Sequence, residues 1–415
     1  MTDIRSTGKL AIDGGTPIRD IHKNPWPKWP VYGRAEEQIL RKVLKSGQWW
    51  YVEGEHGIAF EQEFANFQES KYGISCSNGT AALEIVLRSL EIGLGDEVIV
   101  PPYTFIATAS TALMTGATAV FADIDRNTLN ISPDAVEKVI TSRTRAIICV
   151  HIAGRPADMD RLIEIAKKHN IYLIEDAAQA HGAAWRGRRV GSLGDLGTFS
   201  FQASKNLNSG EGGIILSNDE HLADAAWSVM NVGRVRSGKW YEHRFLGGNF
   251  RITEFQAAIL RAQMTRLPDQ IVKRERNAAL LRSRLSALKG IILPSQDERI
   301  STHANHLFTF RLDLNEINGR SRDMFVKALH AEGIPALSGY VPLYKEALFQ
   351  CAAVRKAREY TGSSLIDYPN LNLPECEQVC KDSVWLMQQL LLGTKKDMED
   401  IAEAISRIMG EWMKK

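Results

Sequence analysis

The stretch AIICVHIAGRPADMDRLIEIAKKHNIYLIED, residues 146–176, contains two apolar runs with a helical pattern between them. The runs 146–151 and 172–176 are short and apolar, as is typical of buried strands. Between them, 159–169 carries apolar residues at the spacing of one helix face. A strand, a helix and a second strand in this order predict that the two strands lie parallel in one sheet.

The same alternation continues on both sides of this stretch. A second helix is predicted at 82–90, where Leu83, Val86, Leu87 and Leu90 fall on one face. The other apolar runs that indicate strands are 97–100, 119–124, 197–201 and 213–216. Strands alternating with helices predict an α/β fold whose mixed, mostly parallel sheet is flanked by helices.

After about residue 255 the pattern changes to that of a smaller α+β unit. It begins with a long helical stretch, 255–288, interrupted at Pro268. The later elements are strands at 306–314 and 334–340 and helices at 322–332 and 396–412. Near the other end, 24–32 contains three prolines and is expected to be extended. We therefore predict an N-terminal arm over 1–33, a large domain over 34–262 and a small domain over 263–415.

Composition excludes several classes of protein. The chain has 415 residues, which is too long for one hydrophobic core, and a net charge of +2, which gives no support to a nucleic-acid partner. Its five cysteines show no zinc spacing, and no metal site is predicted. Because there is no signal-peptide core and no membrane-length apolar run, we expect a cytoplasmic protein that does not contact a membrane.

Two motifs could hold a charged ligand at the ends of predicted strands. In SNGTAA (residues 77–82), Gly79 allows close approach to the start of a helix, whose free amides can bind a phosphate, and Thr80 adds a hydroxyl. The alternative is a plain helix cap. In IEDAAQ (residues 174–179), Asp176 lies at the carboxyl end of a buried strand, where ligands of such sheets bind. It could pair with a protonated pyridine nitrogen, or it could simply cap the next helix.

A lysine follows in FSFQASK (residues 199–205), between a strand end and the glycine-rich turn SGEGG (residues 209–213). Lys205 could act there as a desolvated nucleophilic amine, although a single lysine is usually a surface residue. The order of four features along the chain favours the nucleophilic role over that of a surface lysine. A phosphate cradle, an aromatic residue, an aspartate at a strand end and then a lysine are the layout of a fold-type-I enzyme that uses pyridoxal 5′-phosphate (PLP).

Taken together, six strings resemble the DegT–StrS group of sugar aminotransferases over nearly the whole chain. They are SNGTAAL (77–83), PPYTFIAT (101–108), HIAGRPADMD (151–160), EDAAQAHG (175–182), TFSFQASK with SGEGG (198–205 and 209–213), and GNFRITEFQAA (248–258). Three further segments are most similar to two branches of that group, the inosose (cyclitol) aminotransferases and the 3-amino-5-hydroxybenzoate synthases. These segments are 10–19, 26–32 and 46–51.

The resemblance implies a role for each matching residue. Lys205 would carry PLP as a Schiff base and then move the proton, and Asp176 would pair with the pyridine nitrogen. The other implied cofactor contacts are Phe105 on the ring face, Gln179 at the ring hydroxyl, Gly79, Thr80 and Ser200 at the phosphate, and Asn249 at the phosphate of the neighbouring subunit. That last contact implies a homodimer with shared active sites.

Two residues are implied at the substrate. Arg251 would hold the carboxylate of the amino donor. Tyr344 stands in PLY (residues 342–344), where many members of the group have a histidine, so the acceptor could differ from a nucleotide-linked sugar. The alternative for Tyr344 is simple packing.

The predicted function is transfer of an amino group from glutamine or glutamate to a keto-sugar or keto-cyclitol by a ping-pong mechanism. One alternative is an aromatising aminobenzoate synthase. Another is a non-catalytic PLP-binding sensor, although the chain has no helix-turn-helix segment that would support it. A nicotinamide-dependent dehydrogenase is disfavoured because no G-x-G-x-x-G follows the first strand.

Overall fold

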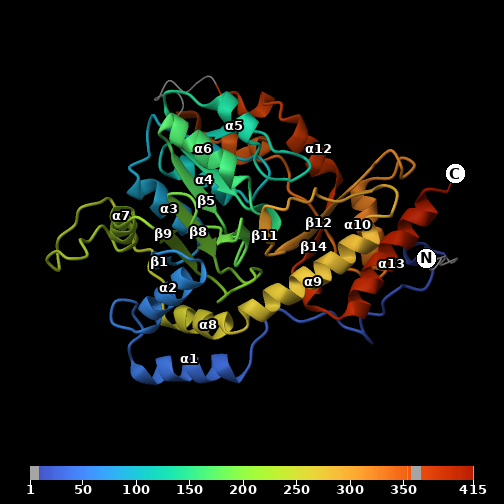
Figure 1. Ribbon diagram of the computed structural model, residues 1–415, viewed down its shortest axis with the longest axis horizontal. Helices are drawn as coiled ribbons and strands as arrows, with labels where there is room; N and C mark the ends of the chain where they lie inside the picture. The colour runs from blue at the N-terminus through green and yellow to red at the C-terminus, as the bar shows by residue number, and fades with distance from the viewer. Residues whose placement is uncertain (1–8, 353, 357–365, 415) are drawn as a thin grey trace.

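The computed structural model describes residues 9–352, 354–356 and 366–414. A seven-stranded sheet lies at the centre of its larger part, with helices packed around it (Figure 1). Its strands, in spatial order, are β1 (Tyr72–Cys76), β9 (Gly213–Ser217), β8 (Leu196–Ser200), β5 (Tyr172–Asp176), β4 (Thr144–Val150), β2 (Glu97–Val100) and β3 (Thr118–Phe121). Only β9 runs antiparallel to its neighbours. The predicted mixed, mostly parallel sheet is therefore confirmed.

The helices of this part follow the chain around the sheet. They are α1 (Arg34–Ser46), α2 (His56–Phe67), α3 (Gly79–Ser89), α4 (Ala107–Met114), α5 (Pro133–Val139), α6 (Met159–His169), α7 (Glu220–Met230) and α8 (Glu254–Met264). The α6 helix has the bounds that its apolar spacing predicts. It begins at an N-cap, Asp158, whose side chain accepts a hydrogen bond from the Arg161 amide.

A four-stranded antiparallel sheet forms the smaller part, at the right of Figure 1. Its order is β10 (Ile291–Ile292), β12 (Leu307–Leu312), β14 (Ser383–Met387) and β13 (Leu337–Ser338). The helices of this part are α10 (Arg322–Ala331), α12 (Pro374–Asp382) and α13 (Lys395–Trp412). A separate three-stranded sheet joins β11 (Ile300–Thr302) to β6 (Ala184–Trp185) and β7 (Arg188–Arg189). Among the described residues, no helix is both long and apolar enough to cross a membrane.

One helix, α9 (Leu267–Leu285), belongs to the hydrophobic cores of both parts. Leu267 and Ile271 pack in the core of the large sheet, whereas Leu281 and Leu285 pack in the core of the small one. Pro268 lies in the first turn of α9, where proline is tolerated, so it separates α8 from α9 without breaking either. In Figure 1, α9 runs as one straight ribbon from α8 into the small part.

The packing differs from the predicted 263–415 unit in one segment. Leu343, Tyr344, Phe349, Val354 and Tyr368, which fall in the predicted small domain, pack in the core of the large sheet. Tyr344 and Phe349 pack against Phe121 on the edge strand β3, and Tyr368 donates a hydrogen bond to the Ala119 carbonyl of that strand at 2.7 Å. The segment thus covers an edge that would otherwise expose unpaired backbone groups.

Candidate active site

A cavity of about 790 Å³ opens where β5 and β8 end and where the small sheet faces the large one. Seven of the residues predicted for the site line it. They are Gly79, Thr80, Phe105, Asp176, Gln179, Ser200 and Lys205. The carboxyl ends of parallel strands are where ligands of α/β sheets bind, so the sheet topology brings these distant residues together.

Asp176 is the last residue of β5 and is 5% exposed. Its Oδ2 accepts a hydrogen bond from the Thr108 hydroxyl at 2.8 Å, and its Oδ1 accepts one from the Ala178 amide at 3.2 Å. The Thr104 hydroxyl lies 3.1 Å from that of Thr108. Burial raises the pKa of the Asp176 carboxyl, while the Thr108 hydrogen bond opposes that rise. The site therefore holds a desolvated carboxylate suited to a cationic partner.

Lys205 lies in a turn that leaves β8 and returns to β9. The Lys205 amide donates to the Gln202 carbonyl at 2.8 Å, and the Ala203 amide donates to the Gly210 carbonyl at 3.0 Å. Within the part of the chain that the structure describes, the Lys205 amine has no hydrogen-bond or ion-pair partner and faces the cavity. Burial lowers its pKa to about 8, although the Asp176 carboxylate opposes the shift.

This lowered pKa predicts how Lys205 reacts with an acylating reagent in ligand-free protein. Only the neutral amine reacts, so labelling should rise through about pH 8. In urea, where the chain is unfolded, the same residue should label with a midpoint near the ~10.4 of a free lysine. Acetylation followed by peptide mass spectrometry measures both midpoints. Equal midpoints in the folded and unfolded states would contradict the assigned desolvation.

The start of α3 and the end of β8 form a polar cradle. Asn78 caps α3 by accepting a hydrogen bond from the Ala81 amide at 2.8 Å, and the first amides of the helix have no intrahelical acceptors. A Cβ at Gly79 would lie 2.7 Å from the Ser200 Cβ, so only glycine allows this approach. Ser200 is in turn held by His181, whose Nε2 donates to its carbonyl at 2.9 Å. Free amides and a hydroxyl at a helix N-terminus can hold a phosphate.

Two further predicted residues border the cavity from opposite sides. Phe105 lines the cavity and is 57% exposed, so its side chain is accessible to a ligand. Gln179 is buried, and its Oε1 accepts a hydrogen bond from the Ala153 amide at 2.6 Å. Its Nε2 donates to the Tyr340 hydroxyl at 3.1 Å, which links the large part to the small one across the cavity.

Three predicted residues do not line the cavity. Asn249 is exposed on the segment between α7 and α8 and forms an isolated β-bridge with Asn231. Arg251 donates to the Asn231 side chain at 2.8 Å and lies over the Trp50 ring. Tyr344 is fully buried, and its hydroxyl donates to Glu377 at 2.8 Å. The structure therefore places Tyr344 in the core rather than at the substrate site predicted for it, because its ring covers the edge strand β3.

The small part supplies cavity residues that the sequence analysis missed, among them His306, Tyr340 and Trp385. The Tyr340 and Trp385 rings meet edge to face at 4.5 Å. The side-chain nitrogen of Asn206 donates a hydrogen bond to the Ala304 carbonyl. Its Oδ1 therefore faces His306 and accepts a hydrogen bond from Nδ1 at 3.1 Å. Burial lowers the pKa of His306 well below its usual value, so the imidazole is neutral. These residues follow ordinary strand patterns that do not indicate which sheet edge they face.

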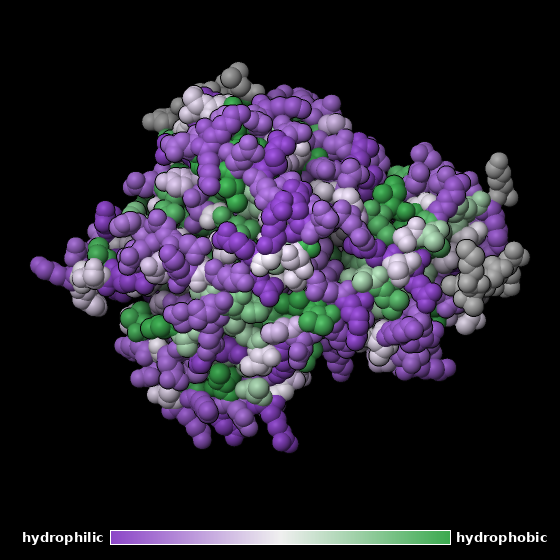
Figure 2. All heavy atoms as spheres, viewed as in Figure 1, coloured by the Kyte–Doolittle hydropathy of each residue, from purple (hydrophilic) through white to green (hydrophobic). Residues whose placement is uncertain are grey.

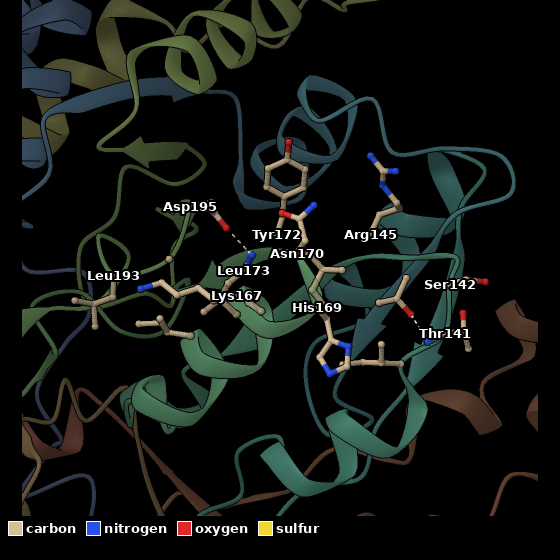
Figure 3. Close-up of a pocket in the computed structure, with 16 residues that line it drawn as sticks. Thr141, Ser142, Arg145, Lys167, His169, Asn170, Tyr172, Leu173, Leu193 and Asp195 are labelled. Atoms are coloured by element: carbon tan, nitrogen blue, oxygen red, sulfur yellow. Dashed lines mark hydrogen bonds between the residues drawn. The ribbon is translucent and has the colours of Figure 1, made fainter.

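A second hollow, of about 840 Å³, lies at the other end of the strands, where β4, β5 and β8 begin (Figure 3). Some of its polar groups already have partners. Asp195 accepts a hydrogen bond from the Leu173 amide at 2.8 Å, and the Thr141 amide donates to Thr144 at 2.9 Å. Lys167 and His169 belong to the last turn of α6, where cations are favoured by the helix dipole. None of the sixteen residues that line this hollow was predicted for the site.

Comparisons with known proteins agree over nearly the whole chain. The model of the DegT/DnrJ/EryC1/StrS aminotransferase family matches residues 31–390. An L-glutamine:2-deoxy-scyllo-inosose aminotransferase of Streptoalloteichus tenebrarius is 36% identical over 421 residues, covering 96% of this chain and 97% of that protein. A 3-amino-5-hydroxybenzoate synthase of Amycolatopsis mediterranei is 35% identical over 384 residues, covering 92% of this chain and 96% of that one.

Two solved structures share the fold. The aminotransferase from Psychrobacter cryohalolentis superposes with a TM-score of 0.86 at 34% identity, covering 94% of this chain and 100% of that one. The crystal structure of 3-amino-5-hydroxybenzoic acid synthase gives a TM-score of 0.84 at 34% identity, covering 93% and 99%. The arrangement of both parts, not only the central sheet, is therefore shared.

Proposed function

Because the chain belongs to the DegT/DnrJ/EryC1/StrS aminotransferase family, we propose that it moves the amino group of glutamine to a keto-cyclitol. Glutamate and a keto-sugar are the second choices of donor and acceptor. The chain is a PLP-dependent aminotransferase with the predicted fold. The observation that carries the proposal is the unpartnered Lys205 amine, which faces a cavity that also contains the buried carboxylate of Asp176.

The residues of the cavity fit PLP. Gly79, Thr80 and Ser200 would hold its phosphate, since they line the cavity together at the start of α3, where Gly79 approaches Ser200 closely. Asp176 would pair with the ring nitrogen, for which a buried carboxylate is suited. Phe105 would lie against the ring and Gln179 would reach the ring hydroxyl. When bound, PLP supplies an electron sink that stabilises negative charge on the substrate carbon.

Lys205 would hold the cofactor and then carry the proton of the donor. An amine whose pKa is about 8 is partly neutral near pH 7, so it can accept a proton and return it. An ordinary lysine, with a pKa near 10.4, would be almost entirely protonated at that pH. The Thr108 hydroxyl and the Ala178 amide both donate to Asp176, and these hydrogen bonds favour its charged form. The first choice of substrates follows the relatives' names, glutamine and an inosose.

Isotope transfer tests this proposal. Purified protein is followed by visible absorbance through addition of glutamine, then glutamate, then 2-deoxy-scyllo-inosose or a nucleotide-linked keto-sugar. Glutamine labelled with ¹⁵N at the α-amino group should pass the label to the cyclitol, while glutamine labelled at the side-chain amide should not. Failure of every amino donor to change the spectrum would leave the PLP-binding sensor as the better description.

A second function is favoured by one observation, the 3-amino-5-hydroxybenzoate synthase that matches in both sequence and structure. A synthase of that kind would release an aromatic product. Ultraviolet absorbance of the product therefore separates the two, because an amino-cyclitol has no aromatic band. An aromatic product from a suitable keto-cyclic precursor would replace the first choice of acceptor.

The segment between α7 and α8 supports a homodimer with shared sites. It projects from the body in Figure 1 and carries Trp240, Tyr241 and Leu246, which are 76%, 75% and 82% exposed. The loop between α1 and α2 also exposes Trp49 and Val52. Figure 2 shows further hydrophobic side chains at the surface of this face of the molecule. Large exposed apolar groups of this kind mark contact surfaces. Asn249, on the projecting segment, would then reach the phosphate of the partner's cofactor.

Mixing Asn249→Ala with Lys205→Ala tests the shared site, at a PLP concentration low enough to leave Asn249→Ala largely without cofactor. Asn249→Ala alone should weaken cofactor binding about tenfold, the loss expected for a hydrogen bond to a charged group. After subunit exchange between Asn249→Ala and Lys205→Ala at equal amounts, about a quarter of all sites would be intact, because each mixed dimer contains one complete site. Activity should therefore return to that level. Activity that stays at the sum of the separate variants would contradict a shared site.

A further inference from the structure

The N-terminal arm contacts the turn that carries Lys205. The indole nitrogen of Trp29 donates a hydrogen bond to the Ala203 carbonyl at 2.9 Å, two residues before the lysine. Gln388, in the small domain, approaches the Ser204 carbonyl of the same turn. Arg274 of α9 contacts both Trp29 and Gln388. Side chains from three segments far apart in sequence therefore converge beside this turn.

Arg274 of α9 lies at the centre of this convergence. Its guanidinium is fully buried, lies 5.4 Å from the centre of the Trp29 ring, and donates to the Gln388 Oε1 at 3.0 and 2.6 Å. Gln388 in turn lies 3.5 Å from the Ser204 carbonyl through its Nε2. The Arg274 Nη1 has no hydrogen-bond partner, and no carboxylate forms an ion pair with this side chain among the residues described.

A buried guanidinium without a carboxylate is costly, so its surroundings must offset that cost. Here they do so with an amide oxygen and an aromatic face, both of which attract a cation. These same two side chains, Gln388 and Trp29, approach the carbonyls of Ser204 and Ala203. The charge of Arg274 thus orients the two groups that hold the backbone just before Lys205.

We propose that Trp29 is a positioning residue for Lys205, acting through the Ala203 carbonyl. The proposal rests on the proposed function, in which the Lys205 amine must meet the α-proton of the donor. Small displacements of such a group slow a reaction strongly, since proton transfer requires near hydrogen-bond geometry. Trp29 does not line the cavity, so its effect would pass through the backbone of the turn.

The arm provides a matched control in Trp26. Its indole nitrogen also donates to a backbone carbonyl at 2.9 Å, that of Gly333, and a guanidinium, that of Arg19, also lies over its ring at 3.9 Å. Trp26 therefore makes the same two kinds of contact three residues earlier, but on the small domain. Replacing either tryptophan with phenylalanine removes one indole hydrogen bond and keeps an aromatic ring.

Two measurements separate positioning from a general structural role. In Trp29→Phe holoenzyme, the maximal rate of the glutamine half-reaction should fall about fivefold, the effect of one lost hydrogen bond, with the half-saturating glutamine concentration within about twofold. In Trp26→Phe that rate should stay within about twofold of the parent. Trp29→Ala, which also uncovers Arg274, should lower the rate further than Trp29→Phe.

Hydrogen exchange provides a readout that needs no turnover. In the cofactor-free protein, Trp29→Phe should speed exchange of the Ala203 and Lys205 amides about fivefold, whereas Trp26→Phe should leave them unchanged. Equal exchange and equal half-reaction rates in the two variants would overturn the positioning role. If the parent enzyme fails to respond to glutamine, the proposed function fails, and the exchange comparison still decides the role of Trp29.

Discussion

Replacing Lys205 with alanine is expected to lower turnover with glutamine by at least about 10⁴-fold while the protein still folds. The substitution removes both the group that would hold the cofactor and the base that would move the proton. Folding should not suffer, because the Lys205 amine has no partner among the described residues and burial already disfavours its charged form. Steady-state turnover and thermal unfolding of the variant measure the two effects.

Lys205→Arg provides the matched control for charge. Arginine keeps a long cationic side chain but stays protonated, so it can act neither as nucleophile nor as base. Its turnover should be as low as that of Lys205→Ala. Donor-dependent turnover that survives in either variant would contradict the catalytic role of Lys205. A melting temperature more than a few degrees below that of the parent would instead give Lys205 a structural role.

Asp176→Asn is expected to reduce the donor half-reaction about 10³-fold, as removal of one preorganised electrostatic group does in other enzymes. The amide has nearly the same shape but no negative charge, so it would no longer favour a proton on the ring nitrogen. The electron sink would weaken although cofactor could still bind. Rapid-mixing absorbance with glutamine measures this rate, and a rate within tenfold of the parent would contradict the role given to Asp176.

Thr108→Val tests the same carboxylate through its hydrogen bond and should have a smaller effect. It removes the 2.8 Å hydrogen bond to the Asp176 Oδ2 and should lower the half-reaction rate about tenfold, as expected for loss of a hydrogen bond to a charged group. Thr111→Val is the control, because Thr111 is equally buried on α4 but donates only to the Ala107 carbonyl. Equal rates in the two valine variants would show that the hydroxyl of Thr108 does not support Asp176.

The central sheet could be predicted from sequence because its strands are short apolar runs between helices with clear periodicity. The α6 helix shows this best, since its apolar spacing and its Asp158 cap determine both ends. The described strands that were not predicted are β1, β6, β7, β10, β11 and β14. Of these, β6, β7 and β10 have only two residues each and no pattern. Tyr344, Phe349 and Tyr368 were predicted in the small domain but pack in the core of the large sheet, for a related reason. Aromatic residues that cover a sheet edge do not show in sequence which edge they cover.

Some residues of the candidate site could likewise be predicted from the sequence, and others could not. Asp176 and Lys205 could be predicted because strand ends on a parallel sheet meet at one edge, which topology alone requires. His306 and Tyr340 could not, since they reach that edge from another domain. Arg251 and Asn249 lie outside the cavity of their own chain, so their predicted roles depend on a partner subunit.

The α9 helix has a mechanical consequence. A helix of 19 residues is about 28 Å long, and each end of α9 is fixed in a different core. It would therefore act as a lever, so that a tilt of about 10° at Leu267 would carry the far end by about 5 Å. Arg274 lies about 10 Å along the helix from Leu267, so the same tilt would move it by only about 2 Å. The opposite wall of the cavity, with Tyr340 and Trp385, would therefore move further than the turn that carries Lys205.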